Sequence, residues 1–258
     1  VKLVRVIGYN DVQEFDPFLM LDAFDSADPK DYVAGFPWHP HRGIETVTYL
    51  IEGEIEHGDS MGNKGSINDG CCQWMTGGSG IIHQEMPQES RLMLGTQLWI
   101  NLPKKDKMTD PAYRDIREHQ IPVIQGEGSE VRIISGFYEG KAGPEQGDYV
   151  KTLYLDIKLE PDASWDLSVN PGNTLFIYIV RGSVHTDNQE VPYHRAVLFG
   201  EGDTLSLKAG SEGARIFLYS AKPLGEPIAW AGPIVMNTRE ELSLAQRELR
   251  EGTFIKHA

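Results

Sequence analysis

The stretch GEIEHGDSMGNKGSINDGCCQWMTGGSG, residues 53–80, decides the fold class of this chain of 258 residues. It contains eight glycines in 28 residues, and short apolar or β-branched runs separate them. Glycine at this density permits repeated tight turns, which join neighbouring antiparallel strands. The stretch therefore predicts an antiparallel all-β region.

Runs with period-2 alternation extend this prediction in both directions along the chain. Such runs of β-branched and aromatic residues, bounded by turn residues, are typical of strands. By contrast, Pro103–Glu118 is polar and contains two prolines, so we interpret it as a crossing segment. The predicted strands are Ile44–Ile51, Glu54–His57, Gly95–Leu102, Val131–Phe137, Thr152–Leu159, Thr174–Val180, Ala196–Phe199, Thr204–Leu207 and Arg215–Ser220.

The two halves of the chain carry a faint repeat. Tyr49–Ile55 (YLIEGEI) resembles Tyr178–Val184 (YIVRGSV) at an offset of 129 residues, half the chain length. The polar run Glu139–Asp148 lies between the halves. These features predict two copies of one β fold, residues 1–138 and 149–258, joined by a linker at 139–148. The alternative is one large β-sandwich without duplication.

One helix is expected, at the end of the second domain. Thr238 and Glu241 have the spacing of a capping box, which satisfies free N–H groups at a helix start. Leu242 and Ala245, with Leu249, then share one helical face, and a glycine at 252 follows. Glycine just past the last periodic residue is a helix stop signal.

The net charge excludes two classes of partner. The chain has 24 Lys and Arg against 38 Asp and Glu, which gives a formal charge of −14. A protein that grips nucleic acid or anionic membrane unaided needs clusters of positive charge. No apolar run approaches the roughly 20 residues of a transmembrane helix, and the first ten residues lack a signal-peptide core. We therefore expect a cytoplasmic protein with neither partner.

The two cysteines, Cys71 and Cys72, are neighbours in the sequence. Adjacent cysteines bridge each other only with backbone distortion, so the chain has no disulfide scaffold. This absence fits a reducing compartment. Both cysteines are small residues close to Trp74 in the sequence. We therefore expect them to fill the core, in preference to binding a metal as thiolates.

Two short motifs are candidates for a metal centre. His39 and His41 form one i, i+2 pair, and His83 and Glu85 form another that follows a glycine turn. Side chains at i and i+2 of a strand point to the same face, so two such pairs can converge on one cation. Three imidazoles and a carboxylate suit Fe(II), Mn(II), Ni(II), Cu(II) or Zn(II). The alternative is two surface pairs with no shared partner.

Two further polar residues lie near these motifs. Glu45 falls on the same face as His39 and His41 if the strand is regular. It is then a fifth ligand, a hydrogen-bond acceptor for an imidazole N–H or a charge at the barrel mouth, and we favour the acceptor. For His57, on the next strand, we expect a solvated or edge position in preference to ligation.

Four segments make the chain resemble the pirins, a family of the cupin superfamily. Within them, the WMTGGSGIIHQEMP run joins the glycine turn to His83 and Glu85. The segments are Gln13–Leu21 (QEFDPFLML), Gly35–Leu50 (GFPWHPHRGIETVTYL), Gln73–Pro87 (QWMTGGSGIIHQEMP) and Pro223–Thr238 (PLGEPIAWAGPIVMNT). One departure is Asn68–Cys72, where pirins usually have a Pro-Gly-Asp-type turn, which leaves the turn shape in doubt.

The resemblance implies a bicupin with two face-to-face antiparallel β-barrels and one metal in the first. The family's ligands then fall on His39, His41, His83 and Glu85. Glu45 lines the site without joining the metal set. The second barrel lacks ligands, since the repeat offset puts Ser168 and Asn170 where the first has histidines.

The resemblance also implies an activity, because bacterial pirins are similar to quercetin 2,3-dioxygenases. We then expect one divalent transition metal, Fe(II) before Mn, Ni, Cu or Zn, and a flavonol-like substrate that is opened with O2. Glu85 is the candidate catalytic residue, as general base for the substrate hydroxyl. Because ligation needs neutral imidazoles, metal loss at acid pH is expected.

Two other functions remain as alternatives. The first is a non-enzymatic, metal-bearing redox sensor that acts on a transcription factor or metabolic enzyme through protein contacts. At −14 such a protein is expected to favour a basic protein partner. The second is a sugar isomerase or lectin-like cupin, which the pirin-like segments disfavour. A monomer is expected from the family.

Overall fold

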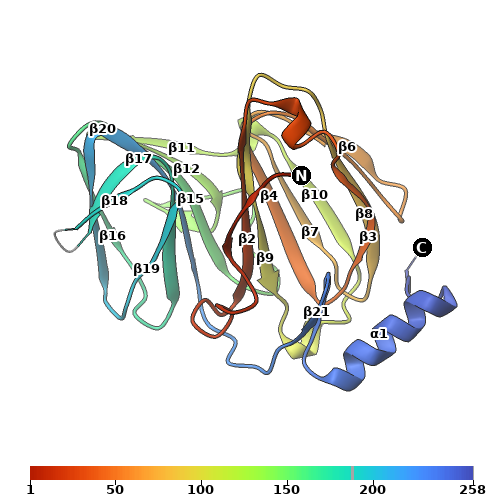
Figure 1. Cartoon of the computed structure of the whole chain (residues 1–258). Coiled ribbons are helices and arrows are strands. Elements are labelled where there is room, and N and C mark those ends of the chain that lie inside the picture. Colours follow the sequence, from red (N-terminus) through yellow and green to blue (C-terminus); the bar gives the residue numbers. More distant parts are fainter. Residues whose placement is uncertain (187–188, 258) are drawn as a thin grey trace. The chain divides into compact units, whose positions relative to one another are not determined.

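The computed structural model describes residues 1–186 and 189–257, and the chain divides into two compact units. Unit 1 comprises Val1–Gln13, Phe18–Glu118 and Leu224–Ala258. Unit 2 comprises Glu14–Pro17 and His119–Pro223. Each unit is built mainly from antiparallel strands, which Figure 1 labels along the chain.

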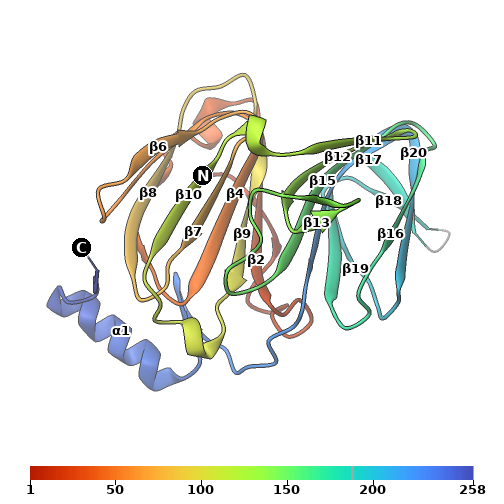
Figure 2. The same ribbon diagram turned by 180° about the vertical axis from the view of Figure 1, so that it is seen from behind.

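Unit 1 contains two main sheets. The six-stranded sheet has the order β1 (Val4–Ile7), β2 (Phe18–Ser26), β9 (Met93–Asn101), β4 (Ile44–Glu52), β7 (Cys72–Thr76) and β10 (Ala112–Ile116). The four-stranded sheet has the order β3 (Phe36–His41), β8 (Ile81–Pro87), β5 (Ile55–Asp59) and β6 (Lys64–Ile67). Figure 2 shows β4, β7 and β10 side by side from behind.

The central strands of unit 1 are buried on both faces. Every residue of β9 is buried, and so are the first seven residues of β4. Both strands nevertheless carry polar side chains, such as Thr48 and Gln97. Polar groups in such a place must be hydrogen-bonded, because burial without a partner is costly. These residues therefore indicate a polar interior, which is where the candidate site lies.

Unit 2 is organised around one sheet. Its path is β11 (Val123–Gly126), β12 (Ser129–Ser135), β15 (Thr152–Leu159), β20 (Thr204–Ala221), β17 (Thr174–Thr186) and β18 (Gln189–Pro192). Two more strands pair beside this path, β16 (Ser164–Ser168) with β20 and β19 (Arg195–Leu198) with β17. A short hairpin joins β13 (Phe137–Tyr138) to β14 (Lys141–Ala142). The core is aliphatic, with Ile133, Leu155, Ile177 and Leu218 fully buried.

The predicted all-β class is confirmed. The predicted Ile44–Ile51, Thr152–Leu159 and Gly95–Leu102 correspond to β4, β15 and β9. The repeated segments also fold alike, because each runs along strand structure with a positive-φ glycine, Gly53 in one and Gly182 in the other. Only glycine adopts this backbone conformation without strain.

Two details of the strand prediction are wrong. The polar segment 103–118 contains β10, which pairs with β7 over five residues, so it is not merely a crossing segment. The predicted strands Thr204–Leu207 and Arg215–Ser220 are the two ends of one long strand, β20. Gly210 and Gly213 lie between them, where the pairing of β20 with β17 shifts register between Ala209 and Ala214.

The segment 224–258, here called the C-terminal tail, contains a small hairpin and the helix. The hairpin pairs β21 (Ala229–Ala231) with β22 (Ile234–Met236), and α1 (Arg239–Glu251) follows. The capping box of Thr238 and Glu241 is present, and Gly252 ends the helix in the left-handed conformation. The helix prediction is confirmed.

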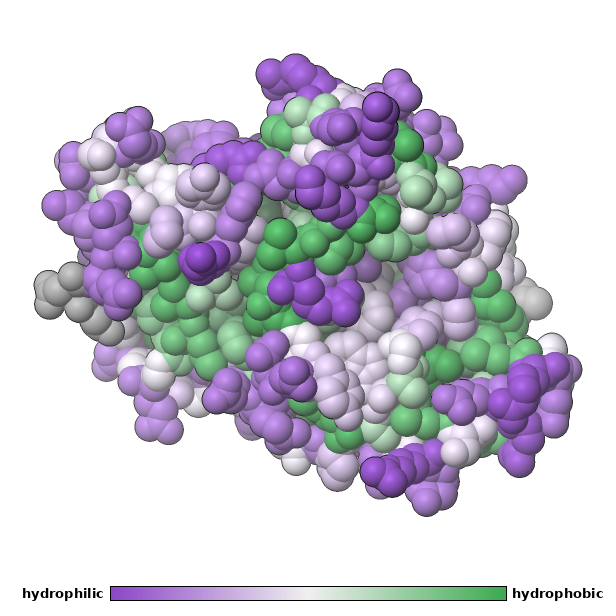
Figure 3. Space-filling model, viewed as in Figure 1, coloured by the Kyte–Doolittle hydropathy of each residue, from purple (hydrophilic) through white to green (hydrophobic). Residues whose placement is uncertain are grey.

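One face of α1 packs on unit 1. Ala245 is fully buried, and Leu242 and Leu249 pack with it against β22, Phe254 and Ile82 of β8. The other face is polar, and Figure 3 shows hydrophilic side chains gathered over α1 on the side viewed. In the part of the chain that the structure describes, no helix has the length and apolarity needed to cross a membrane.

The compact units differ from the predicted ranges 1–138 and 149–258. Strand β12 pairs with β15 along its length, so residues from 119 onward belong with the second sheet. The predicted linker 139–148 lies inside unit 2, where it contains β14. The tail returns to unit 1 because its apolar face is buried there. The polarity of the sequence does not reveal that residues 119–138 belong to unit 2 and the C-terminal tail to unit 1.

Candidate metal centre

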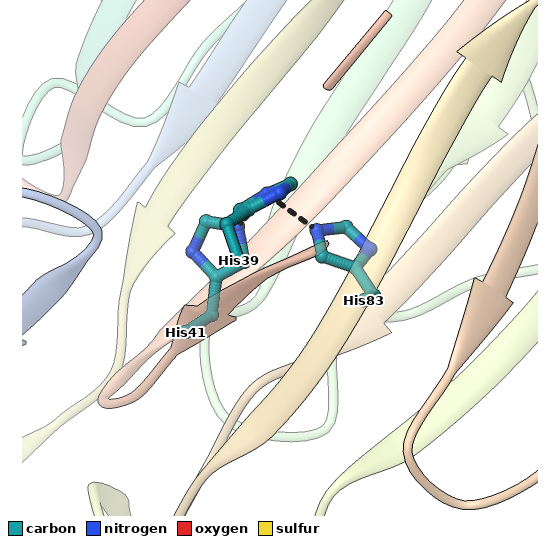
Figure 4. Close-up of side chains that lie close together, drawn as sticks. All are labelled: His39, His41 and His83. Atoms are coloured by element: carbon teal, nitrogen blue, oxygen red, sulfur yellow. Dashed lines mark hydrogen bonds between the residues drawn. The ribbon is translucent and has the colours of Figure 1, made fainter. Parts of the chain in front are cut away.

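Three histidines of unit 1 converge at one point. His39 and His41 come from the end of β3, and His83 comes from the middle of β8. His39 and His83 are direct cross-strand partners, which brings their side chains together. The Nε2 atom of His39 lies 3.0 Å from that of His41 and 2.9 Å from that of His83. Figure 4 shows the three rings facing one another.

Backbone carbonyls define the tautomers of two of these rings. The Nδ1 atom of His39 lies 2.9 Å from the carbonyl oxygen of Pro37, and Nδ1 of His41 lies 3.2 Å from that of Pro233. Because a carbonyl only accepts, we assign the proton of each neutral ring to Nδ1. The Nε2 lone pairs of His39 and His41 therefore face each other, an arrangement that a shared cation stabilises.

The spacing and charge state also fit a divalent transition metal. Two nitrogens bound at about 2.1 Å on adjacent octahedral positions lie about 3.0 Å apart. Burial, followed by the charges of neighbouring histidines, holds the pKa of His41 and of His83 well below its usual value. Both rings are therefore neutral near pH 7, which is the form that binds metals.

Glu85 lies beside the three histidines. Its Oε2 is 3.9 Å from Nε2 of His83. The side-chain amide of Gln97 donates to both carboxylate oxygens, at 2.9 and 2.8 Å, and the hydroxyl of Thr48 donates to Oε1 at 3.2 Å. These donors hold the carboxylate near the histidine group. The structure thus brings all four predicted residues into one region, with the three histidines as the tight cluster.

Sequence reasoning did not find Gln97 or Thr48. Gln97 stands in the apolar run of β9, where a long polar side chain has no reason to occur in a purely structural strand. A polar residue at such a position needs a buried partner. That mismatch between residue and pattern was the available signal.

Glu45, which the sequence marks as a neighbour of the site, is fully buried on β4. It accepts a hydrogen bond from the hydroxyl of Thr76 at 2.8 Å, and a guanidinium nitrogen of Arg114 lies 3.7 Å away. Its carboxylate therefore has a hydrogen-bond donor on β7 and a positive charge on β10. Neither contact makes it a metal ligand.

The expectation of a solvated or edge position for His57 is wrong. The residue is buried on β5, a strand that pairs with both β8 and β6. Its ring lies 4.9 Å from that of Tyr113, and its Nε2 is 3.4 Å from a carboxylate oxygen of Asp115. Asp115 and Tyr113 lie on β10, so the missed strand is what encloses His57.

The cysteine prediction is confirmed as far as packing goes. Cys71 and Cys72 are both buried, and neither is part of a disulfide. Cys71 belongs to an apolar cluster with Leu50, Ile55 and Ile67. They therefore contribute to the core of unit 1.

Two of the histidines, His39 and His41, line a cavity of about 580 Å³ within unit 1. His39, His41 and Glu85 are part of its lining. Aromatic side chains form much of the rest: Trp99 meets His41 edge-on at 5.0 Å, Trp230 lies 5.8 Å from Trp99, and Tyr9 lies 5.6 Å from Trp230. The site therefore combines nitrogen donors with walls suited to a flat apolar molecule.

Two family models match the chain, one in each half. Residues 1–100 match the family model described as Pirin, and residues 154–255 match the one described as Pirin C-terminal cupin domain. The chain belongs to the pirin family. The second match runs into the C-terminal tail, which by its contacts belongs to unit 1.

Similar pirins occur across bacteria and animals. A pirin-like protein of Caulobacter vibrioides is 42% identical over 98% of this chain and 93% of its own. Human pirin is 40% identical over 96% of this chain and 86% of its own. A crystal structure of quercetin 2,3-dioxygenase from Acinetobacter baumannii is 33% identical, covers 98% of this chain and 91% of that one, and superposes with a TM-score of 0.89.

Unit 2 offers no comparable cluster within residues 119–186 and 189–223. Among all described residues, the group of three His, Cys, Asp or Glu side chains arranged to hold an ion is the one in unit 1. Ser168 ends β16, and Asn170 follows it in a turn. The interior of the unit is filled by aliphatic side chains.

Proposed function

We propose that the chain is an iron(II)-dependent dioxygenase of the pirin type that opens the ring of quercetin-like flavonols with O2. The observation that carries this proposal is the cluster of His39, His41 and His83 at a cavity lined by tryptophans. The similarity to the Acinetobacter quercetin 2,3-dioxygenase over nearly the whole chain supports the same proposed activity.

The proposed metal set is His39, His41, His83 and Glu85. Three histidines and one carboxylate leave two positions open on an octahedral metal, an arrangement that resembles the histidine and carboxylate sites of non-haem iron oxygenases. When bound, iron(II) supplies a Lewis acid for the substrate hydroxyl and an electron donor for O2.

Glu85 is the proposed general base. Its carboxylate faces the cavity, where a flavonol hydroxyl near the histidines comes within reach of it. As Glu85 is also a proposed ligand, it would act as the base by moving off the metal, and the amide of Gln97, which donates to both oxygens, would keep the carboxylate beside the cavity. Correct geometry of this kind is the first requirement of general base catalysis.

The cavity favours flat aromatic substrates. Trp99 and Trp230 present tilted ring faces with an interplanar angle of 39°, next to the ring of Tyr9. Offset or edge contacts between aromatic rings are favourable beyond the burial of area alone. We expect Trp230→Leu to raise KM for quercetin more than it lowers kcat, since Trp230 touches the substrate and not the reacting hydroxyl.

Metal loading under anaerobic conditions tests the proposal. The protein is loaded separately with Fe, Mn, Ni or Cu, then mixed with quercetin and O2, and carbon monoxide is measured with loss of the flavonol absorbance. We expect turnover that His39→Ala abolishes while the variant remains folded. Turnover with none of the four metals would refute the enzyme and favour the non-catalytic alternative.

A further inference from the structure

The C-terminal tail contacts the histidine cluster directly. The carbonyl oxygen of Pro233 accepts the hydrogen bond from Nδ1 of His41, across 192 residues of sequence. Trp230, three residues earlier, lines the cavity. A segment from the far end of the chain therefore determines which nitrogen of His41 carries the proton.

Lys107 fastens the tail two residues beyond Pro233. Its ammonium group donates to the carbonyl oxygens of Gly43 and Val235, at 2.8 and 2.9 Å, and to the side-chain oxygen of Asn101 at 2.7 Å. An ammonium has three N–H groups, and here each meets an oxygen. Burial lowers the pKa of Lys107 to about 7, although the negative charges of Glu226 and Glu241 act to raise it.

Arg42 fastens the tail at two more points. Its guanidinium lies 2.7 Å from a carboxylate oxygen of Glu248, donates to the carbonyl oxygen of Phe254 at 2.9 Å, and stands 4.2 Å above the Phe254 ring. Arg42 is almost fully buried and directly follows His41 in the sequence. Its backbone carbonyl also accepts from the amide of Val235 at 3.0 Å.

The backbone of β22 packs so closely against Gly43, in the turn between β3 and β4, that no space remains between them. A Cβ atom added to Gly43 would lie 2.0 Å from the carbonyl oxygen of Val235. Lys107 and Arg42 thus hold β22 against the β3–β4 turn. We call these two residues and their tail partners, Val235, Glu248 and Phe254, the tail clasp.

We propose that the C-terminal tail is a positioning element of the metal centre, in which the tail clasp holds Pro233 so that its carbonyl fixes the tautomer and orientation of His41. The inference rests on the proposed metal-binding function. A ligand histidine whose other nitrogen donates to a fixed acceptor presents its free nitrogen in one direction. Loss of such an acceptor typically lowers metal affinity by about 10–100-fold.

Lys107→Met tests this role without touching a histidine. The full chain is measured by chelator competition for Fe(II) and Zn(II), and the His41 ring nitrogens of the metal-free protein are observed by NMR. We expect a drop in affinity of about tenfold or more and loss of the single Nδ1–H form. The control is Lys256→Gln, which removes a lysine that donates to Glu248 and Thr253 within the tail itself. The metal affinity of this control should stay within about twofold of wild type, which is a smaller change than the roughly tenfold loss expected for Lys107→Met.

The outcomes separate the two proposals. Wild-type affinity and an unchanged His41 spectrum in Lys107→Met would overturn the role of the tail. If that variant does not fold, Glu248→Gln weakens the clasp at its far end, and an unchanged His41 spectrum with faster exchange of the amides at 234–236 has the same meaning. A wild-type protein that binds neither metal would instead refute the proposed function, whereas the His41 spectrum of the metal-free chain still reports on the tail.

Discussion

At the scale of single residues, the candidate metal centre includes groups that hold the proposed ligands in place. Gln97 is the clearest example, because one side-chain amide donates to both oxygens of Glu85. Without it a buried carboxylate loses its main donor, and a buried acceptor left unpaired is costly. The position of Glu85 is therefore set by β9 as much as by its own strand.

We expect Gln97→Leu to lower metal affinity and kcat by about tenfold or more, in line with the loss of other groups that orient ligands. The matched control is Gln73→Leu, which removes another buried glutamine whose amide donates to Asp115 at 3.3 Å. Chelator competition and quercetin turnover are the measurements. Equal losses in the two variants would show that Gln97 acts only through general stability.

The sequence marked the proposed ligands but not the groups that support them. His39 and His41, like His83 and Glu85, are recognisable because i, i+2 spacing on a strand is a local property. Gln97 and the carbonyl of Pro233 reach the site from β9 and from the tail, and nothing local links them to a histidine. A backbone carbonyl carries no residue identity, so the sequence could not mark Pro233.

At the scale of secondary-structure elements, α1 contributes charge as well as apolar contact. Glu248 faces Arg42 from the β3–β4 turn and Lys256 from the chain after the helix, each at 2.7 Å. Burial acts to raise the pKa of Glu248, but hydrogen bonds from Lys256 and Arg42 outweigh it and hold the pKa below its usual value. The contribution of this carboxylate to stability is therefore present above the unfolded pKa and is lost as pH falls through the folded value.

We therefore expect Glu248→Gln to lower the free energy of unfolding of the metal-free protein at pH 7 and to have little effect near pH 3. Urea midpoints measured from pH 7 to pH 3 give the difference between wild type and variant. Glu251→Gln, on an exposed position of the same helix, serves as the control. A difference that does not shrink with acid would contradict the charge-based role of Glu248.

The elements also show where pattern reading fails. The capping box and apolar face of α1 are contained in 15 residues, so the helix was predictable from its own sequence. Strand β10 was missed because its polar side chains, Arg114 and Asp115, have buried partners on other strands: Glu45 on β4 for Arg114, and Gln73 and His57 for Asp115. Its polarity reflects the interior it faces, which only the fold reveals.

At the scale of the whole molecule, the two units use similar sheets for different interiors. The core of unit 2 is aliphatic, whereas the interior of unit 1 contains buried histidines, carboxylates and amides. The exchange of segments between the units, with residues 119–138 in unit 2 and the tail in unit 1, follows from strand pairing and burial between segments far apart in sequence. The polar run at 139–148 lies within unit 2, and some of its residues, such as Glu145, are buried there.

This division predicts that the units respond differently to the same loss of packing. Leu98 on β9 and Leu218 on β20 are both fully buried. Replacement of either by alanine should cost about 2–5 kcal/mol in the free energy of unfolding, as measured with urea. Only Leu98→Ala should also lower metal affinity in chelator competition under native conditions, because Leu98 lies between Gln97 and Trp99. No residue of unit 2 lies among the histidines or the described lining of the cavity, so Leu218→Ala should leave the affinity unchanged. Lowered affinity in Leu218→Ala would instead mean that unit 2 supports the metal centre as well.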